Sequence, residues 1–252
     1  MRILLTNDDG INAEGLLALY DELSKMADVM VVAPDSERSA VGHGITIYDP
    51  LRVKEFYRNG KLIGYSSSGT PADCVKLGVS TLMDSRPDLV ISGINAGPNV
   101  GVNVLYSGTV SGAMEGALLG IPSMAVSLAS WTSHDYAFAA HEAGILVNDI
   151  LNLKLPRGTL LNVNIPDLSQ KNYAGEKITF QSKVAWTDRY EQRTDPGNRR
   201  YYWLNGEPND MLYEEGSDAK AIQDGYVSIT PLHCDMTDWT ILEERFGIKR
   251  EA

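Results

Sequence analysis

The segment that decides the fold stands at the amino end of the sequence and reads Met1-Arg2-Ile3-Leu4-Leu5-Thr6-Asn7-Asp8-Asp9-Gly10. A short apolar run is followed directly by two adjacent carboxylates inside turn-forming residues. In an open α/β sheet, ligands bind outside the carboxyl ends of the strands. The segment therefore predicts a buried strand that delivers Asp8 and Asp9 to a binding edge of a sheet.

Two interpretations of this carboxylate pair are open from these residues alone. Adjacent carboxylates repel each other unless a cation or a proton joins them, and a hard divalent cation takes oxygen ligands. The first interpretation is therefore a metal site on Asp8 and Asp9. The alternative is a solvated turn, because Asn-Asp-Asp-Gly is also favourable turn chemistry.

Composition limits the class of protein. The chain has 252 residues, of which 43% are hydrophobic, as expected for one large α/β domain. Its 22 Lys and Arg against 33 Asp and Glu give a net charge of -11. This balance argues against binding to the backbone of a nucleic-acid polymer, which needs clustered cations. A small anionic substrate is still compatible with it. The two cysteines, Cys74 and Cys234, indicate no disulfide framework.

The sequence contains no signal that predicts export or membrane insertion. The first residues lack the basic and then apolar pattern of a secretory signal. The longest apolar stretch, residues 117–129, is interrupted by Gly120 and Pro122 and is too short to span a bilayer. We expect a soluble cytoplasmic protein without a membrane partner.

The first half of the chain alternates between two apolar patterns. Continuous apolar runs, typical of strands covered on both faces, lie at residues 3–5, 29–33, 89–92 and 124–127. Helices are predicted from apolar positions at helical spacing over 16–26, from the helix-start pattern Thr70-Pro71-Ala72-Asp73 with apolar positions to Met83, and over 110–119. This alternation predicts right-handed βαβ crossovers and a doubly wound, mainly parallel, Rossmann-like sheet.

The second half is more polar. It predicts a helix over 136–153 and strands over 159–165 and 225–232. Residues 179–186 and 199–204 flank a turn at Asp195-Pro196-Gly197-Asn198 and could pair as a long hairpin arm. Such an arm would expose Trp186, Tyr201, Tyr202 and Trp203, which predicts self-association. The alternative is that these aromatic residues cover the main domain.

Three other loops lie where a doubly wound sheet would place a site. In residues 34–44, Ser36 or Ser39 could add a hydroxyl ligand, or the segment is an ordinary loop. In residues 93–103, Asn95 offers a neutral hard ligand. A mobile glycine loop is the alternative, and we favour it for Asn99 and Asn103.

The third loop, Tyr106-Ser107-Gly108-Thr109, precedes a predicted helix. The free N–H groups of a helix start form a ready anion site, and N-capping by Ser107 or Thr109 is a compatible alternative. The combined set of ligands is rich in oxygen, with Cys74 inside a predicted helix and His43 alone. It therefore favours Mg²⁺ or Mn²⁺ over a structural Zn²⁺ and predicts metal-assisted phosphoryl chemistry.

These segments together resemble the successive motifs of the SurE family, the survival-protein acid phosphatases that act as 5′/3′-nucleotidases. The resemblance rests on Asn7-Asp8-Asp9-Gly10, Ala33-Pro34 with Ser39, Gly69 to Val75, Ser92-Gly93-Ile94-Asn95 and Tyr106 to Val110, and then on Asn162 to Pro166 and Gly225 to Leu232. These motifs run in order over nearly the whole chain. Any one of them is weak, but the series is highly specific.

The resemblance implies a single domain over 1–252, with a Rossmann-like core over 1–130. Residues 131–252 would complete the core and add an oligomerisation arm at about 180–216. The implied assembly is a homodimer or homotetramer that exchanges C-terminal elements. No residue role is carried over between Lys171 and Glu215.

The resemblance also implies a site and an activity. One divalent ion per subunit, Mg²⁺ or Mn²⁺, would be held by Asp8, Asp9, Ser39 and Asn95. Phosphate would be bound by Asn95, Ser107, Gly108 and Thr109. Asp8 and Asp9 would be the catalytic residues of a phosphomonoesterase that hydrolyses nucleoside 5′- and 3′-monophosphates, with some members cleaving short polyphosphate. His43 is a weak candidate for the acid, with a structural role as the alternative.

Competing classes of protein fit less well. A receiver domain needs an aspartate after the strand at 89–92, which is followed by Gly93-Ile94-Asn95. Residues 7–15 contain neither the Asp-x-Asp of a haloacid-dehalogenase phosphatase nor the Gly-x-Gly-x-x-Gly of a dinucleotide oxidoreductase. A binding module that holds an anion without turnover is the remaining alternative.

Overall fold

A large mixed sheet forms the centre of the molecule in the computed structural model, which describes residues 1–133, 135–167, 172–208 and 213–249. Within these residues the sheet has nine strands. Their spatial order is β3 (Val53–Arg58), β4 (Lys61–Ser67), β2 (Asp28–Pro34), β1 (Arg2–Thr6), β5 (Leu89–Ala96), β6 (Ser123–Ala129), β7 (Thr159–Pro166), β11 (Val227–His233) and β8 (Glu176–Ile178).

The central strands, from β4 to β7, are parallel to one another, whereas β3 pairs antiparallel with β4 and β11 pairs antiparallel with β7. The predicted mainly parallel α/β sheet is thus confirmed. Every residue of β5 except its last is buried. Continuous burial of this kind is why these strands appear in the sequence as unbroken apolar runs.

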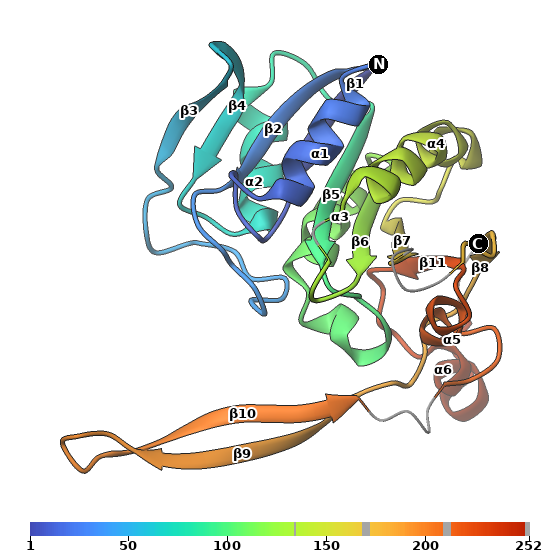
Figure 1. Ribbon diagram of the computed structural model, residues 1–252. Coiled ribbons are helices and arrows are strands. Elements are labelled where there is room, and N and C mark those ends of the chain that lie inside the picture. Colours follow the sequence, from blue (N-terminus) through green and yellow to red (C-terminus); the bar gives the residue numbers. More distant parts are fainter. Residues whose placement is uncertain (134, 168–171, 209–212, 250–252) are drawn as a thin grey trace.

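Helices cover both faces of the sheet (Figure 1). Helix α1 (Glu14–Leu23) packs with α4 (Ala137–Leu153), and α2 (Pro71–Leu77) packs with α3 (Gly108–Leu118). Alternate residues of β1 enter different cores, because side chains alternate across a strand. Leu5 joins the large cluster under α1 and α4, whereas Leu4 joins the cluster with Val75 of α2. The sheet is therefore doubly wound, as predicted.

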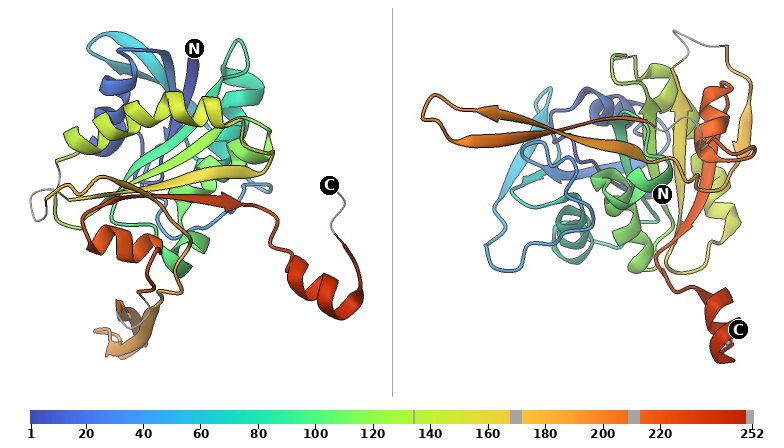
Figure 2. Two further views of the ribbon diagram at one scale, coloured as in Figure 1. Left: turned by 90° about the vertical axis from the view of Figure 1, so that its right-hand side faces the viewer. Right: turned by 90° about the horizontal axis from the view of Figure 1, so that it is seen from below.

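The order of the strands reverses beside β1. The chain passes from β1 to β2 on one side, and later returns to β5 on the other side. Thr6 at the end of β1 is in register with Ser92 of β5. Such a reversal opens a crevice at the carboxyl ends of the two strands. The segments after β1 and at the end of β5 are therefore placed together, on the face seen from below in Figure 2.

Some predicted helix boundaries were wrong. The helix predicted over 16–26 ends at Leu23, and the helix predicted over 110–119 begins at Gly108. The pattern from Thr70 to Met83 forms α2 and then a short π-helix, Gly78–Leu82. The predicted start is confirmed, because the Thr70 hydroxyl accepts a hydrogen bond from the Asp73 N–H (3.1 Å).

The predicted hairpin arm exists, but its first strand starts later than predicted. Strands β9 (Trp186–Thr194) and β10 (Arg200–Pro208) form a separate two-stranded ribbon that projects from the body (Figure 1). Residues 179–185 belong instead to the body, where the Val184 carbonyl accepts from the Val102 N–H (2.9 Å). Tyr201, Tyr202 and Trp203 are exposed, as predicted. The side chain of Trp186 lies outside the described part of the structure.

Several elements escaped prediction, namely β3, β4, β8, a 3-10 helix (Gly101–Leu105), α5 (Asp218–Gln223) and α6 (Trp239–Phe246). Helix α6 has no buried residue and stands away from the body (Figure 2). Among the described residues, none of the helices combines the length and the apolar character needed to cross a membrane.

Candidate active site

Asp8 lies directly after β1, at the point where the strand order reverses. Its side chain is buried and accepts hydrogen bonds from both the hydroxyl and the backbone N–H of Thr109, at the start of α3. Gly108 makes this approach sterically feasible. A methyl group on Gly108 would lie 2.8 Å from an Asp8 carboxylate oxygen. The structure therefore joins the turn after β1 to the first turn of α3, two segments that are distant in the sequence.

Asp9 points to the neighbouring strand and accepts a hydrogen bond from the backbone N–H of Ala96, at the end of β5. Burial and then the charge of Asp8 raise the pKa of Asp9 to about 7. Burial also raises the pKa of Asp8, although the hydrogen bonds from Thr109 oppose that effect. Two carboxylates with raised pKa values side by side are an arrangement that a cation would stabilise.

The surrounding turn is itself well ordered. The Asn7 side-chain amide donates to the Gly10 carbonyl (3.0 Å), and the Ile11 N–H donates to the Pro34 carbonyl (2.8 Å). The Arg38 N–H donates to the Asp8 carbonyl (2.7 Å), which brings the loop after β2 to the same crevice. The predicted turn chemistry is thus present, and the turn positions the two carboxylates that the metal-site interpretation uses.

Ser39 belongs to this loop and is exposed. Its hydroxyl donates to the carboxylate of Glu37 (2.7 Å), and no hydrogen bond between Ser39 and either aspartate is found in the described residues. Glu37 was missed by the sequence analysis. Its charge makes a small contribution to the raised pKa values of Asp8 and Asp9, after the larger effect of burial. Its position two residues before the candidate ligand Ser39 is the feature of the sequence that could have indicated it.

Asn95 lies near the end of β5 and is largely buried. Its amide nitrogen donates to the carbonyl oxygens of Gly97 (2.8 Å) and Ala96 (3.3 Å). This orientation leaves Oδ1 as the atom of Asn95 that can bind a cation, whereas a phosphate would need the amide hydrogens. Asn99 was interpreted as part of a mobile loop, but it is buried and its side chain donates to Ser127 Oγ (2.9 Å).

The start of α3 supplies the predicted anion-binding segment. Ser107 is the N-cap residue, and its hydroxyl oxygen accepts from the Val110 N–H (3.0 Å). Gly108 begins the first turn, where backbone N–H groups lack partners within the helix. Thr109 uses its hydroxyl and its N–H on Asp8. In this structure Thr109 therefore positions a carboxylate, while Gly108 and Ser107 carry the donors that suit an anion.

His43 lies in the same long loop but is directed elsewhere. Its Nε2 lies 3.0 Å from Oε2 of buried Glu115, and Nζ of Lys76 lies 2.8 Å from the other oxygen. Glu115 is two turns along α3 from Gly108. This contact supports the structural alternative for His43, as a residue that fastens the loop onto α3.

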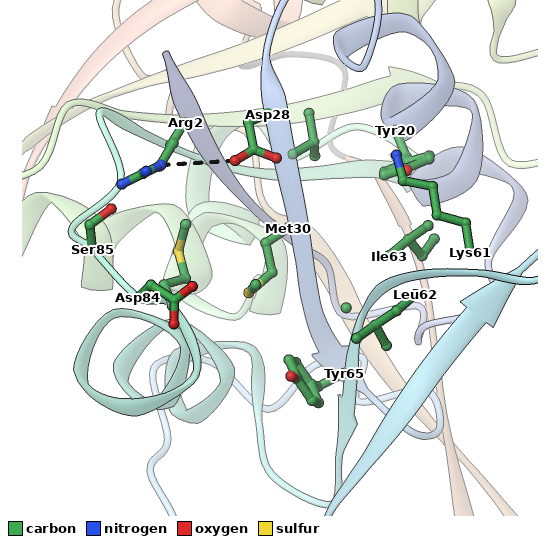
Figure 3. Close-up of a pocket in the computed structure, with 13 residues that line it drawn as sticks. Arg2, Tyr20, Asp28, Met30, Lys61, Leu62, Ile63, Tyr65, Asp84 and Ser85 are labelled. Carbon is green, nitrogen blue, oxygen red and sulfur yellow. Dashed lines mark ion pairs between the residues drawn. The ribbon is translucent and has the colours of Figure 1, made fainter.

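A separate cavity of about 200 Å³ lies at the opposite end of the sheet (Figure 3). It is lined by residues from the amino ends of β1, β2 and β4, including Arg2, Asp28 and Lys61. Arg2 and Asp28 form an ion pair there at 3.8 Å. The cavity is therefore remote from Asp8 and Asp9.

The ligands in the crevice suit a hard divalent ion. Among the described residues, no group of three or more His, Cys, Asp and Glu side chains could hold a metal. The crevice instead combines two carboxylates with the amide oxygen of Asn95 and, on the adjacent loop, the hydroxyl of Ser39. All are oxygen ligands, which Mg²⁺ and Mn²⁺ prefer.

Comparison with known proteins identifies the family of this chain. A family model described as "Survival protein SurE" matches residues 3–188. The chain belongs to the SurE family. It is 48% identical over 97% of its length to a protein named 5′-nucleotidase SurE from Heliobacterium modesticaldum, and covers 90% of that relative. It is 50% identical over 96% of its length to a protein of the same name from Syntrophus aciditrophicus, and covers 92% of it.

The fold of a solved SurE structure is also similar. The crystal structure of the SurE protein from Aquifex aeolicus matches with a TM-score of 0.84 and 42% identity, over 97% of this chain and 98% of that one. The SurE resemblance stated from the motifs and the α/β fold class predicted from the sequence are both confirmed.

Proposed function

We propose that this chain is a metal-dependent nucleotidase that releases phosphate from nucleoside 5′- and 3′-monophosphates. The observation that carries the proposal is the contact between Asp8 and Thr109, which lies in the first turn of α3. This contact supports a site in which the carboxylate pair stands beside a helix start whose N–H groups suit an anion. The curated names of the relatives, 5′-nucleotidase SurE, support the 5′ activity. Cleavage of short polyphosphate is a further activity that we propose on the family resemblance.

Each residue has a distinct part in the proposed reaction. The Gly108 N–H and the Ser107 hydroxyl bind the phosphate oxygens. Asp8, oriented by Thr109, would accept the proton of the attacking water and return it to the nucleoside oxygen as the ester P–O bond breaks, so that nucleoside and phosphate leave. Asp9 is held by the Ala96 N–H. The amide of Asn95 already donates to the Gly97 carbonyl, and the hydroxyl of Thr109 already donates to Asp8. Either residue would have to give up that hydrogen bond to donate to a phosphate.

The proposed cofactor is one Mg²⁺ or Mn²⁺ ion per subunit. Asp8, Asp9, Ser39 and Oδ1 of Asn95 would hold it. When bound, such an ion polarises the phosphorus of the substrate. It would also neutralise the charges that raise the two aspartate pKa values. Ser39 would exchange its hydrogen bond to Glu37 for this role.

We also propose a homodimer or homotetramer, with residues 1–252 as one domain in a cytoplasmic protein. The exposed aromatic residues of the β9–β10 arm and the isolated position of α6 support exchange of C-terminal elements between subunits. A membrane and a nucleic-acid polymer are not proposed as partners.

The proposal is tested by phosphate release from a panel of 5′- and 3′-monophosphates after chelator treatment, with Mg²⁺, Mn²⁺, Zn²⁺ or no added ion. We expect turnover with Mg²⁺ or Mn²⁺, and its loss in Asp8→Asn and Asp9→Asn variants that keep the parental circular dichroism spectrum. Retained activity in either variant would overturn the residue assignment. Nucleotide binding without turnover under any ion would favour a binding module.

A further inference from the structure

We propose that the indole of Trp131 is the stacking surface for the nucleobase of the substrate. This inference rests on the proposed nucleotidase function and extends it from the phosphate to the base. Trp131 follows β6 and is 65% exposed. An aromatic side chain this exposed leaves a large apolar surface in water, and a bound aromatic ring would cover that surface.

The indole is held in place by a glycine. A methyl group on Gly97 would lie 2.3 Å, 2.4 Å and 2.5 Å from three atoms of the six-membered indole ring. The ring therefore covers the Cα of Gly97 at a distance that no other residue type would permit. Since the side chain is still mostly exposed, the ring is supported on Gly97 and open to solvent elsewhere.

Described residues on either side of Trp131 make close contacts with their surroundings. The Gly97 N–H donates to the carbonyl of Leu128 (2.9 Å), just before the loop. Ser130 Oγ accepts from the Ser133 N–H (3.0 Å). Buried Tyr136, after the loop, lies 3.1 Å from the position of a methyl group on Gly15. The indole is thus a positioned surface, which limits the entropy lost when a base stacks on it.

Gly97, which the indole covers, lies beside the candidate active site. Gly97 lies two residues after Asn95, whose amide donates to the Gly97 carbonyl (2.8 Å). Two peptide units separate their Cα atoms by at most about 7 Å. The intervening Ala96 N–H holds Asp9. A molecule with its phosphate at Ser107 and Gly108, beside Asp8 and Asp9, can therefore extend a ring, one sugar away, onto Trp131 where the indole covers Gly97.

Stacking also defines the class of ligand. Every nucleobase offers a π-face, so recognition on an aromatic side chain tolerates any base. Purines overlap an indole over a larger area than pyrimidines do. We therefore expect all common nucleoside monophosphates to be accepted, with purines preferred. Sugar phosphates without a base would gain nothing from Trp131.

The kinetic test compares AMP with ribose 5-phosphate, which has the same phosphate and sugar but no base. We expect Trp131→Ala to raise KM for AMP about 10-fold and to leave the constants for ribose 5-phosphate unchanged. Trp131→Phe should restore most of the affinity. The control is Tyr57→Ala, which removes another exposed aromatic side chain, from β3 at the far edge of the sheet. It should leave KM unchanged for both substrates.

A binding test needs neither turnover nor metal. Calorimetric titration with adenosine should show weaker binding to Trp131→Ala than to the parent and to Tyr57→Ala. An unchanged KM for AMP and an unchanged adenosine affinity in Trp131→Ala would overturn the inference. So would a larger loss in Tyr106→Ala, because Tyr106 is the 60% exposed aromatic residue next to Ser107 on the other flank.

The two proposals can fail separately. If the parent hydrolyses no phosphomonoester with any ion, the nucleotidase function fails, and the adenosine titration still decides whether Trp131 binds a base. If the parent hydrolyses AMP and Trp131→Ala does so with the same KM, only the stacking inference fails.

Discussion

Gly108 and Asp8 approach so closely that a methyl group on Gly108 would lie 2.7 Å from the Asp8 Cβ and 2.8 Å from one of its carboxylate oxygens. The start of α3 can therefore reach the end of β1 only with glycine at position 108. This contact joins the carboxylate pair to the proposed anion-binding donors.

Gly108→Ala should lower phosphatase activity at least about 100-fold, because displacing a catalytic group by about 1 Å has an effect of this size. The fold should persist, since alanine favours a helix. Phosphate release and circular dichroism are the measurements. Gly144→Ala in α4 is the matched control, because its methyl group would meet no atom closer than 3.4 Å. Equal activity in both variants would show that the contact is unimportant.

Asp9→Asn should raise the melting temperature of the metal-free protein at about pH 8. The pKa of Asp9 is about 7 in the folded state, against an ordinary value of 3.8. Its protonated form therefore favours folding, and this stabilisation is lost as the pH rises through about 7. Asparagine removes the charge and keeps an acceptor for the Ala96 N–H. Differential scanning calorimetry with exposed Asp49→Asn as control tests this, and a lower melting temperature for Asp9→Asn would contradict it.

Glu115→Gln should lower stability near neutral pH and have little effect at acidic pH, where the parent carboxyl is protonated as well. Burial raises the pKa of Glu115, but hydrogen bonds from His43 and Lys76 and the charge of Lys76 outweigh it and leave the pKa below 4.5. The ionised carboxylate therefore stabilises the fold above that ordinary value, and its contribution is lost as the pH falls through the folded-state pKa.

The measurement for Glu115 is urea unfolding between about pH 3 and pH 7. The parent should lose more free energy of unfolding on acidification than Glu115→Gln does. Exposed Glu244→Gln in α6 should follow the parent. Identical pH dependence in parent and Glu115→Gln would exclude the His43–Glu115–Lys76 cluster as a source of acid sensitivity.

Asp218→Ala should destabilise the fold by about 3 kcal/mol, because it leaves buried N–H groups without an acceptor. Fully buried Asp218 accepts from the N–H groups of Gly101 (3.0 Å) and Ser182 (2.9 Å). Ser182 precedes the hairpin arm and Gly101 precedes the segment that we propose to bind phosphate, so we also expect a higher KM for AMP. Urea unfolding and steady-state kinetics test both effects.

The control for Asp218 is Asp224→Ala, which breaks an ion pair with Lys220 near the surface. Such pairs contribute at most about 1 kcal/mol. A loss of stability in Asp218→Ala no larger than that of the control would contradict the assigned role of Asp218.

Replacing Tyr202 and Trp203 by serine should dissociate the proposed oligomer. Both side chains are more than half exposed on the β9–β10 arm, and exposed aromatic clusters mark partner surfaces. Sedimentation velocity should show a smaller species for the double variant than for the parent. A parent that sediments as a monomer, or a variant that sediments like an oligomeric parent, would contradict self-association through the arm.

Local patterns were sufficient for the elements whose physical cause is local. The unbroken apolar run at Ile3 to Leu5 reflects burial on both faces of a parallel sheet, and the strand observed there is β1. Thr70 and Asp73 cap α2 within one turn, so their pattern could be interpreted without the rest of the chain. The turn at Asn7 to Gly10 also has a local cause, because the Asn7 side chain donates to the Gly10 carbonyl.

Pairing between distant segments could not be predicted in this way. Residues 179–185 have a strand-like pattern but bind the body through Val184 and Val102, because tertiary hydrogen bonds override local preference there. The same limit applies to Glu37, whose sequence position indicates an ordinary loop charge, and whose approach to Asp8 and Asp9 depends on how the loop after β2 folds back.

By itself the sequence indicated the residues that we propose for the chemistry: Asp8 and Asp9 after the first strand, Asn95 near the end of a later one, and Ser107 to Thr109 at a helix start. Only the tertiary structure decided which partner each of these side chains contacts. Thr109 gives its donors to Asp8, Asn95 gives its amide hydrogens to the Gly97 loop, and Trp131 covers Gly97 beside them. Hydrogen-bond partners and steric contacts depend on which strands become neighbours, and strand order is a property of the whole fold.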